Sequence, residues 1–292
     1  MRALGERFLL GRDAPYEPAR GGGLIRMAAE HGDAEAIEIM SILAALGVGQ
    51  KSDWARALSY LRAAADAGSA QARDQLALIG DASAEQLLEI PPVQRVLETP
   101  RVAVIEGFLS PAQCDWLIAR ASPRLSPARV HDPRDGGRRE VDLRTNSGMG
   151  FSLLQTGFML QLIHARIAAA LALPVLHQEP TNILHYQPGE QYRAHYDFLN
   201  PEEPRFAQQI VAAGQRVATF LIYLNDGYEG GETDFPRANW RFKGRRGDAL
   251  LFFNVTAEGR PDPLTLHAGT PPSRGEKWLL SKWVRDRSLP LI

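Results

Sequence analysis

The sequence predicts an α+β protein whose helices come first and whose strands follow. Residues 24–80 are rich in alanine and carry a helical period. From residue 181 the pattern changes, because short apolar stretches alternate with glycine, proline and asparagine turns. Many short strands with turn signals between them are typical of a β-sandwich or barrel. Helices that precede the strands, without strict alternation, argue against a doubly wound parallel sheet.

The composition is that of an ordinary globular protein with room for one or two domains. The 292 residues are 45% hydrophobic and 23% charged. A net charge of −1 gives no global field that would attract nucleic acid or an anionic membrane. The single cysteine, Cys114, excludes an intramolecular disulfide and a thiolate metal cluster. We find no signal peptide and no stretch of membrane-spanning length, so we expect a cytoplasmic protein.

The alanine-rich segment repeats itself. Residues 28–36 (AAEHGDAEA) align with residues 64–72 (AADAGSAQA), an offset of 64 − 28 = 36. Small residues at fixed places let paired helices pack closely, and a period of this size indicates an α-solenoid. The pattern resembles Sel1-like repeats, which are related to tetratricopeptide repeats. Two interpretations stay open: a helical cap on the next domain or a second subunit, and a surface that binds a protein partner or makes a homodimer.

A break at Ile90-Pro91-Pro92 divides the chain into a helical-repeat segment, 1–90, and a second domain, 91–292. Early in that domain, residues 102–108 are expected to form a strand and 111–121 a helix that begins at the Ser110 cap. A buried helix is predicted over 152–173. The remaining strands are predicted at 181–187, 191–197, 216–224, 232–235, 247–254, 264–268 and 276–285.

One of these strands carries a possible metal site. It ends in His195-Tyr196-Asp197, and residues i and i+2 of a strand project from the same face. His267 offers a third ligand. Two histidines and one carboxylate on one side of an ion form the facial triad suited to non-haem Fe(II) and O2 chemistry.

A lysine follows ten residues after the last histidine. Lys277 lies on a strand expected to line a small barrel, where an unpaired ammonium group is costly and needs an anionic partner. Strand alternation places Leu279, Ser281 and Trp283 on the same inward face, whereas Lys282 is expected to point out. A dicarboxylate that chelates the iron at one end could reach this ammonium group with the other.

Together these residues resemble the 2-oxoglutarate/Fe(II) dioxygenases, and among them the prolyl 4-hydroxylases. The resemblance spans roughly residues 100–286. The motifs that carry it are, in order, Arg144-Thr-x-Ser-Gly148, Tyr186-x-x-Gly189, His195-x-Asp197, residues 214–225 (GQRVATFLIYLN), 230–236 (GGETDFP), 247–253 (GDALLFF), and His267 with Lys277.

The resemblance implies a double-stranded β-helix, or jelly-roll, as the catalytic domain. Fe(II) would be held by His195, Asp197 and His267, which with Lys277 form the catalytic set. Lys277 would pair with the distal carboxylate of 2-oxoglutarate, helped by the hydroxyls of Tyr186 and Thr219. The implied reaction uses O2 to hydroxylate a C–H bond and releases succinate and CO2, and ascorbate is implied as an accessory cofactor.

The substrate is expected to be proline in a peptide or protein. In the prolyl enzymes, residues corresponding to Arg144 and Trp283 line the peptide groove. Relatives often carry histidine two places after the tryptophan, where this chain has Arg285, and this departure puts collagen-like or polyproline substrates in doubt. The polar segments 130–147 and 198–215 are predicted to act as lids.

Two rival functions remain. A hydroxylase of a free amino acid or small metabolite would have an enclosed pocket over the iron, whereas a peptide hydroxylase would have an open groove past Arg144 and Trp283. A helical-repeat adaptor or sensor with an inactive oxygenase domain is a rival of another class. The intact triad and Lys277 argue against it.

Overall fold

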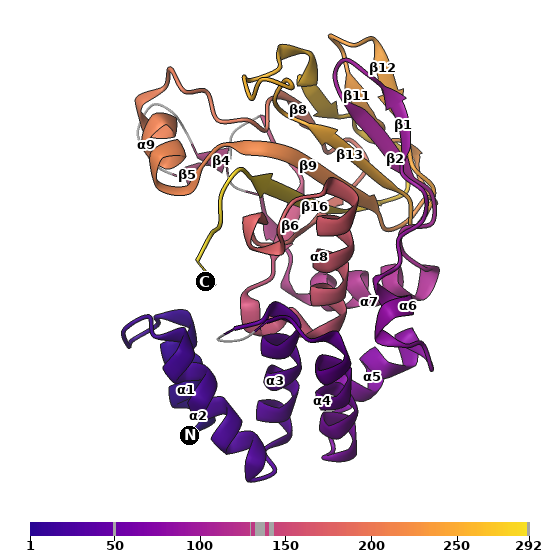
Figure 1. Cartoon of the computed structure of the whole chain (residues 1–292). Helices are drawn as coiled ribbons and strands as arrows, with labels where there is room; N and C mark the ends of the chain where they lie inside the picture. The colour runs from indigo at the N-terminus through magenta and orange to yellow at the C-terminus, as the bar shows by residue number, and fades with distance from the viewer. Residues whose placement is uncertain (49–50, 129, 132–137, 140–142, 291–292) are drawn as a thin grey trace. The chain divides into compact units, whose positions relative to one another are not determined.

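A computed structural model describes the chain except residues 49–50, 129, 132–137, 140–142 and 291–292 (Figure 1). The chain divides into two compact units. The first comprises Met1–Ile90, Phe151–Leu176 and Pro290–Ile292, and the second Pro91–Gly150 and His177–Leu289. Among the described helices, none has the length and apolar character needed to cross a membrane.

The first unit is helical. The helices are α1 (Arg2–Leu10), α2 (Pro18–Glu30), α3 (Ala34–Leu46), α4 (Trp54–Asp66), α5 (Ala70–Ile79), α6 (Ala84–Leu88) and α8 (Gly157–Leu171), with short 3₁₀ turns at Leu153–Gln155 and Val175–His177. Helices α3, α4, α5 and α6 begin at side-chain caps: the side chains of Asp33, Asp53, Ser69 and Ser83 each accept a hydrogen bond from a backbone N–H in the first turn.

Equivalent turns join α2 to α3 and α4 to α5. Gly32 and Gly68 both have positive φ, at 83° and 103°, and each precedes the residue that caps the next helix. The caps Asp33 and Ser69 are separated by 69 − 33 = 36 residues, the offset at which the sequence repeats. The repeated sequence therefore corresponds to a repeated helix–turn–helix.

Helices α1 and α2 pack closely through glycine. A Cβ placed on Gly21 would lie 2.6 Å from the carbonyl oxygen of Gly5 and 2.7 Å from the backbone nitrogen of Leu9. Any side chain at position 21 would force the helices apart, since real Cβ contacts are never this short. Leu9 and Ile25 are fully buried in the core that these helices share with α3.

The second unit is built on two main antiparallel sheets. The larger has the strand order β1-β2-β13-β9-β16-β7-β6-β3, and the smaller has the order β12-β11-β14-β8. The strands of the larger sheet are β1 (Gln94–Leu97), β2 (Val102–Ile105), β3 (Ser126–Pro127), β6 (Ser147–Gly150), β7 (Asn182–Tyr186), β9 (Arg216–Tyr223), β13 (Ala249–Phe253) and β16 (Lys277–Arg285). Those of the smaller are β8 (Tyr192–His195), β11 (Thr233–Phe235), β12 (Trp240–Phe242) and β14 (His267–Gly269).

Short elements complete this unit. Two further pairs of strands are β4 (Val130–His131) with β5 (Arg138–Arg139), and β10 (Glu229–Gly230) with β15 (Pro272–Arg274). Helix α7 (Pro111–Ala121) begins at Ser110, as predicted, and buries Cys114. Helix α9 is Pro204–Ala213, and 3₁₀ turns lie at Ser122–Arg124 and Pro263–Thr265.

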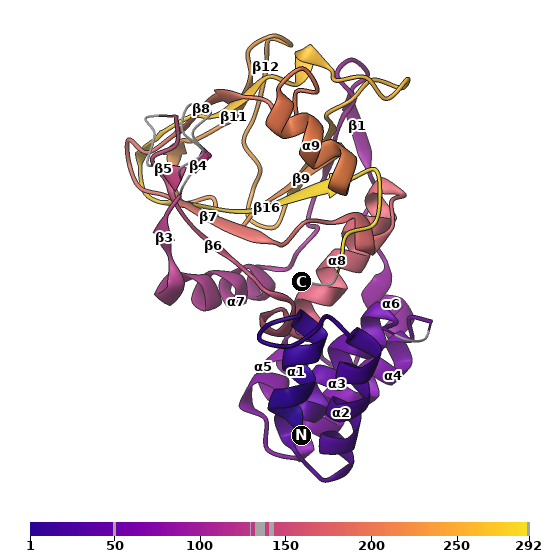
Figure 2. The same cartoon turned by 90° about the vertical axis from the view of Figure 1, so that its left-hand side faces the viewer.

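From β7 onward the chain passes back and forth between the two sheets, with β11 and β12 consecutive in the smaller one. β7, β9, β13 and β16 belong to the larger sheet, and β8, β11, β12 and β14 to the smaller. In Figure 2 the strands β7, β16 and β9 lie opposite β8 and β11. Between the sheets lies an apolar core that includes Leu184, Leu221, Phe235, Phe252 and Leu279. The expected mixture of helices and antiparallel sheets is therefore confirmed.

Some elements differ from expectation. The short strands β1, β3, β6, β10, β12 and β15 were not predicted, nor was α9, which has no buried residue. The predicted lid 198–215 contains α9, whereas much of the lid 130–147 lies outside the described residues. The buried helix expected over 152–173 is present as α8 and clusters with the first unit.

Candidate active site

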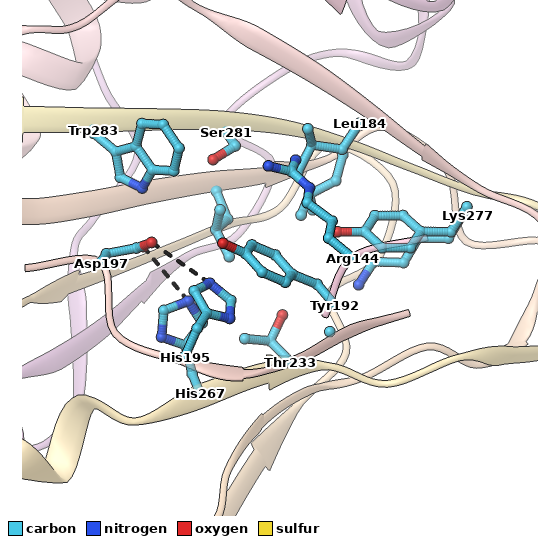
Figure 3. A pocket seen from close by; sticks show the side chains of 14 residues that line it. Arg144, Leu184, Tyr192, His195, Asp197, Thr233, His267, Lys277, Ser281 and Trp283 are labelled. Atoms are coloured by element: carbon cyan, nitrogen blue, oxygen red, sulfur yellow. Dashed lines mark ion pairs between the residues drawn. The ribbon is translucent and has the colours of Figure 1, made fainter. Parts of the chain in front are cut away.

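Three potential metal ligands converge at one end of the second unit. The ligand atoms of His195, Asp197 and His267 all lie within 4.8 Å of one another. The Nε2 atom of His195 is 3.6 Å from Oδ1 of Asp197, and Nε2 of His267 is 3.5 Å from Oδ2 (Figure 3). Strand pairing explains the convergence, because His195 on β8 is the direct cross-strand partner of His267 on β14.

Hydrogen bonds orient both imidazole rings. Nδ1 of His195 lies 2.8 Å from the carbonyl oxygen of Arg193, and Nδ1 of His267 lies 3.0 Å from that of Thr265. A carbonyl oxygen can only accept, so each Nδ1 carries the proton. In a neutral ring with its proton on Nδ1, the Nε2 lone pair is free to bind a metal, and this is the tautomer that a metal ligand needs.

The carboxyl group of Asp197 is buried but held ionised. Burial alone would raise its pKa, yet the neighbouring imidazoles of His267 and His195 and the hydroxyl of Thr219 hold the pKa well below its usual range. Burial, together with His195, lowers the pKa of His267 to about 4. At neutral pH this end of the site holds an anionic oxygen donor and a neutral imidazole donor from His267.

This donor set fits a divalent transition metal. Imidazole nitrogen and carboxylate oxygen are ligands for Fe(II), and two histidines with one carboxylate leave further coordination positions open. The three residues that the sequence predicted as metal ligands are thus brought together by the fold. The arrangement could hold an iron ion and leave room for a chelating co-substrate.

The other end of the same pocket carries a buried cation. Lys277 is 1% exposed, and its ammonium group donates to the carbonyl oxygen of Gly231 at 2.8 Å. Among the described residues no carboxylate lies within ion-pair distance of it. Burial lowers its pKa to about 7. A buried ammonium group without an acidic partner is costly, and an anion bound beside it would offset that cost.

Hydroxyl groups accompany Lys277 from two strands. Tyr186 on β7 is the cross-strand partner of Lys277, and its ring centroid lies 5.2 Å from the ammonium nitrogen. Thr233 on β11 lines the same pocket and is hydrogen-bonded to the hydroxyl of Tyr223 at 2.7 Å. Tyr186 therefore lies where the sequence analysis expected it, and Thr233 joins it.

Thr219 lies elsewhere than the sequence analysis expected. Its hydroxyl donates to Oδ2 of Asp197 at 2.7 Å, at the triad end of the site. Thr219 is paired with Trp283 across β9 and β16, six residues along from Lys277. Of the two threonines, only Thr233 lines the pocket that contains Lys277.

Figure 3 shows the whole arrangement, with the triad at one end, Lys277 at the other, and Tyr192 between them. The same pocket is lined by Leu184, Leu221, Leu279, Ser281 and Trp283. A ligand with a charged group at each end and an apolar middle would match this lining. With a metal cation held by the triad, the positive charges at both ends would suit a short dicarboxylate.

Arg144 and Tyr192 lie where the pocket opens. The guanidinium carbon of Arg144 lies 4.7 Å from the ring centroid of Tyr192, and its Nε donates to Oδ1 of Asn146 at 2.8 Å. The ring of Tyr192 also stacks on His195, with centroids 3.4 Å apart. Burial raises the pKa of Tyr192 to about 12, so its hydroxyl is neutral.

Trp283 is held by a buried charge network. The guanidinium carbon of Arg216 lies 3.7 Å from the centroid of its ring. Both Arg216 and Arg285 donate to the carboxylate of Glu179 at 2.7 Å. Burial would raise the pKa of Glu179, but the two arginines hold it below its usual range. Arg285, the residue that departs from the prolyl enzymes, is thus an anchor for Glu179.

Lys282 was expected to point outward, and its burial differs from what that implies. It lies on the face of β16 opposite Lys277, as strand alternation predicts, but it is 2% exposed and does not reach solvent. Its ammonium group donates to the hydroxyl of Thr181 at 2.9 Å. This second face of β16 is also covered by protein, which a half-buried strand pattern cannot reveal.

An open groove of about 1500 Å³ runs past the site. Arg144 and Trp283 line it together with Arg216 and residues of the 196–206 segment. Arg216 and Glu179 were not among the predicted site residues, although Arg216 belongs to one of the quoted motifs. Nor was Thr233, whose signal was its alternation with Phe235 on an inward-facing strand.

Comparisons with known proteins agree with this geometry. Residues 181–285 match the 2OG-Fe(II) oxygenase superfamily. Prolyl 4-hydroxylase 1 of Arabidopsis thaliana is 36% identical over 206 residues, which cover 65% of this chain and 70% of that protein. Probable prolyl 4-hydroxylase 9 of the same plant is 37% identical over 215 residues, 67% of this chain and 72% of the other.

Solved structures are similar as well. A viral collagen prolyl hydroxylase from Paramecium Bursaria Chlorella virus-1, in a 2OG complex, is 27% identical and covers 63% of this chain and 95% of that chain, with a TM-score of 0.48. A Pseudomonas putida prolyl-4-hydroxylase is 19% identical with a TM-score of 0.43, over 64% of this chain and 93% of that chain.

Proposed function

The chain belongs to the prolyl 4-hydroxylase family of 2OG-Fe(II) oxygenases, and from this premise we propose the residues and the substrate of its reaction. It is a 2-oxoglutarate- and O2-dependent Fe(II) hydroxylase that acts on proline and releases succinate and CO2. The observation that carries the proposal is one pocket with the His195, Asp197 and His267 triad at one end and the buried Lys277 at the other.

We propose that the triad holds Fe(II) and that Lys277 pairs with the distal carboxylate of 2-oxoglutarate. The hydroxyls of Tyr186 and Thr233 line the pocket around that carboxylate. The iron supplies oxygen activation when it is bound. The protein orients the co-substrate between two fixed charges, and the apolar residues Leu184, Leu221 and Leu279 exclude water from its middle.

The substrate is proline in a peptide or protein. The open groove supports this choice over a free amino acid, because its volume of about 1500 Å³ exceeds the 300–1,000 Å³ of typical small-molecule pockets. Arg144 and Trp283 line both the groove and the pocket, so each could contact a bound chain beside the triad.

Other parts of the account are proposals of the same kind. The jelly-roll description is supported by the alternation of strands between two sheets. The Sel1-like nature of 1–90 is supported by its two equivalent turns. Its role is either a helical cap on the next domain or a second subunit, or a surface that binds a protein partner or makes a homodimer. The domain boundary near residue 90, the use of ascorbate and the cytoplasmic location stay predictions from the sequence.

Anaerobic reconstitution tests the site. Fe(II) and 2-oxoglutarate together should produce the weak visible charge-transfer band of the chelate, and the band should be absent from His195→Ala. After air is admitted, succinate release should rise with a proline-containing peptide and not with free proline. Equal stimulation by free proline would favour the small-metabolite hydroxylase instead.

A further inference from the structure

A chain of buried hydrogen bonds leads away from the triad. Nδ2 of Asn254 donates to the hydroxyl oxygen of Thr219 at 3.0 Å, and that hydroxyl donates to Oδ2 of Asp197 at 2.7 Å. Thr219 and Asn254 are both fully buried, and Asp197 is 3% exposed. Neither Thr219 nor Asn254 lines the pocket or the groove, so neither contacts a bound ligand directly.

Strand pairing fixes the position of both residues. Thr219 on β9 is paired with Phe252 on β13, and Asn254 follows β13 directly. The backbone N–H of Asn254 donates to the carbonyl oxygen of Val217, and its own carbonyl oxygen accepts from Asp262. With its backbone held on both sides, Asn254 directs its side chain at Thr219.

The chemistry of the three groups determines which group donates each hydrogen bond. An ionised carboxylate can only accept, so the short contact with Asp197 takes the single proton of Thr219. The hydroxyl oxygen of Thr219 must then accept, and the amide nitrogen of Asn254 supplies the donor. The reverse arrangement would set a hydroxyl lone pair against the charged oxygen of Asp197 at 2.7 Å.

Packing alone does not account for these residues. Valine has the shape of threonine and suits a buried strand without the cost of burying a hydroxyl. Burial of a hydroxyl and an amide between two sheets is tolerated because each satisfies the other and both end on a charge. Removal of one member leaves the next with an unmet hydrogen bond.

We propose that Thr219 and Asn254 are positioning residues, which fix the rotation of the Asp197 carboxylate and thereby the affinity of the triad for its metal. This inference rests on the proposed role of the triad as the metal site. Thr219 acts on Asp197 directly, and Asn254 acts through Thr219. Groups that orient a metal ligand in this way typically change metal affinity by about 10- to 100-fold.

Binding of Co(II) to the metal-free protein tests the proposal without turnover. Thr219→Val should weaken Co(II) binding by about 10- to 100-fold and change the visible spectrum of the bound ion. Thr219→Ser keeps the hydroxyl and should restore both. Asn254→Ala should weaken binding by about 2- to 10-fold, and should have no further effect in the Thr219→Val background.

Thermal unfolding of each metal-free variant separates affinity from folding. If folded Thr219→Val binds Co(II) with the wild-type affinity and spectrum, the positioning role is overturned and the metal site itself is not. If that variant does not fold, Asn254→Ala decides: unchanged affinity and spectrum overturn the inference. Loss of binding in His195→Ala supports the triad, whereas no binding by the wild-type protein would overturn the metal site itself and the inference with it.

Discussion

The burial of Lys277 determines which kind of ligand its ammonium group favours. Its ammonium group is buried beside Tyr186, and the structure supplies it with one carbonyl oxygen and no close carboxylate among the described residues. Burial therefore lowers its pKa from 10.5 to about 7. A bound dicarboxylate would remove this penalty, because the charged form then gains an ionic partner.

Substitution of Lys277 by Met should raise the stability of the ligand-free protein and weaken the binding of 2-oxoglutarate. The unfolded chain binds a proton at this lysine up to its ordinary pKa, and the folded, ligand-free protein only up to about pH 7. The lysine thus destabilises the fold fully below pH 7, and the cost disappears as the pH rises to about 10.5.

Urea unfolding measures this effect. Lys277→Met should raise the free energy of unfolding of the ligand-free protein at pH 6 by more than 1 kcal/mol, since one pKa unit corresponds to about 1.4 kcal/mol. At pH 10 the gain should nearly vanish. The same variant should lose the charge-transfer band at 2-oxoglutarate concentrations that saturate the wild type. An equal gain at both pH values would contradict the account.

The residues of the site could be predicted from the sequence to different degrees. The spacing of His195 and Asp197 predicted one face of a strand, but β8 ends at His195 and Asp197 lies two residues beyond it, outside the strand. Thr219 and Thr233 are both threonines on inward-facing strands, so only the fold shows that Thr219 contacts Asp197 and that Thr233 lines the pocket. Glu179 could not be assigned at all, because its partners lie 37 and 106 residues away.

At the scale of elements, strand pairing positions the side chains of the site. The register of β8 with β14 places the two histidines opposite each other. The register of β16 with β7 places Lys277 opposite Tyr186. A slip of one residue in either pair would send these side chains to the other face. The hydrophobic pattern of the strands sets their register, and the register determines which polar side chains face the pocket.

Glu179 links Arg285, at the end of β16, to Arg216, which lies against Trp283 in the groove. Glu179→Gln should leave Arg216 and Arg285 without their charged partner, and removal of one member of a buried ion pair costs about 3 kcal/mol. Arg216 should then leave the ring of Trp283, so the KM for a peptide should rise. The charge-transfer band with Fe(II) and 2-oxoglutarate should stay.

A surface pair provides the control for this prediction. Glu229→Gln removes the partner of Arg274, and both side chains are exposed, so the change in stability should stay below about 1 kcal/mol. Peptide KM and stability that are the same in both variants would show that Glu179 does not position Arg216.

Close packing of α1 on α2 makes a prediction for the helical unit. Gly21→Ala should destabilise the protein, because its Cβ would meet the backbone of Gly5 and Leu9 at less than 3 Å. Gly23 lies on the same helix, and a Cβ there would meet nothing within 4 Å. Gly23→Ala should therefore stabilise the helix by about 0.5–1 kcal/mol. Thermal unfolding distinguishes the two, and equal shifts would contradict the packing.

At the scale of the whole molecule, the change of period along the chain predicted the class of fold. Helices before residue 90 and strands after residue 181 are both present. The position of α8 could not be predicted, since its burial is plain from its sequence but its partners are not. It clusters with helices that precede it by about a hundred residues. Long-range assignments of this kind depend on tertiary contacts and leave no local signal.

The central claim is that this chain hydroxylates proline in a peptide, and isotope labelling tests it most directly. The protein is incubated with Fe(II), 2-oxoglutarate, a proline-containing peptide and ¹⁸O2, and the products are analysed by fragmentation mass spectrometry. The account predicts one labelled oxygen on a proline of the peptide and one in succinate. Labelled succinate with an unmodified peptide, or an oxygen on another residue, would contradict it.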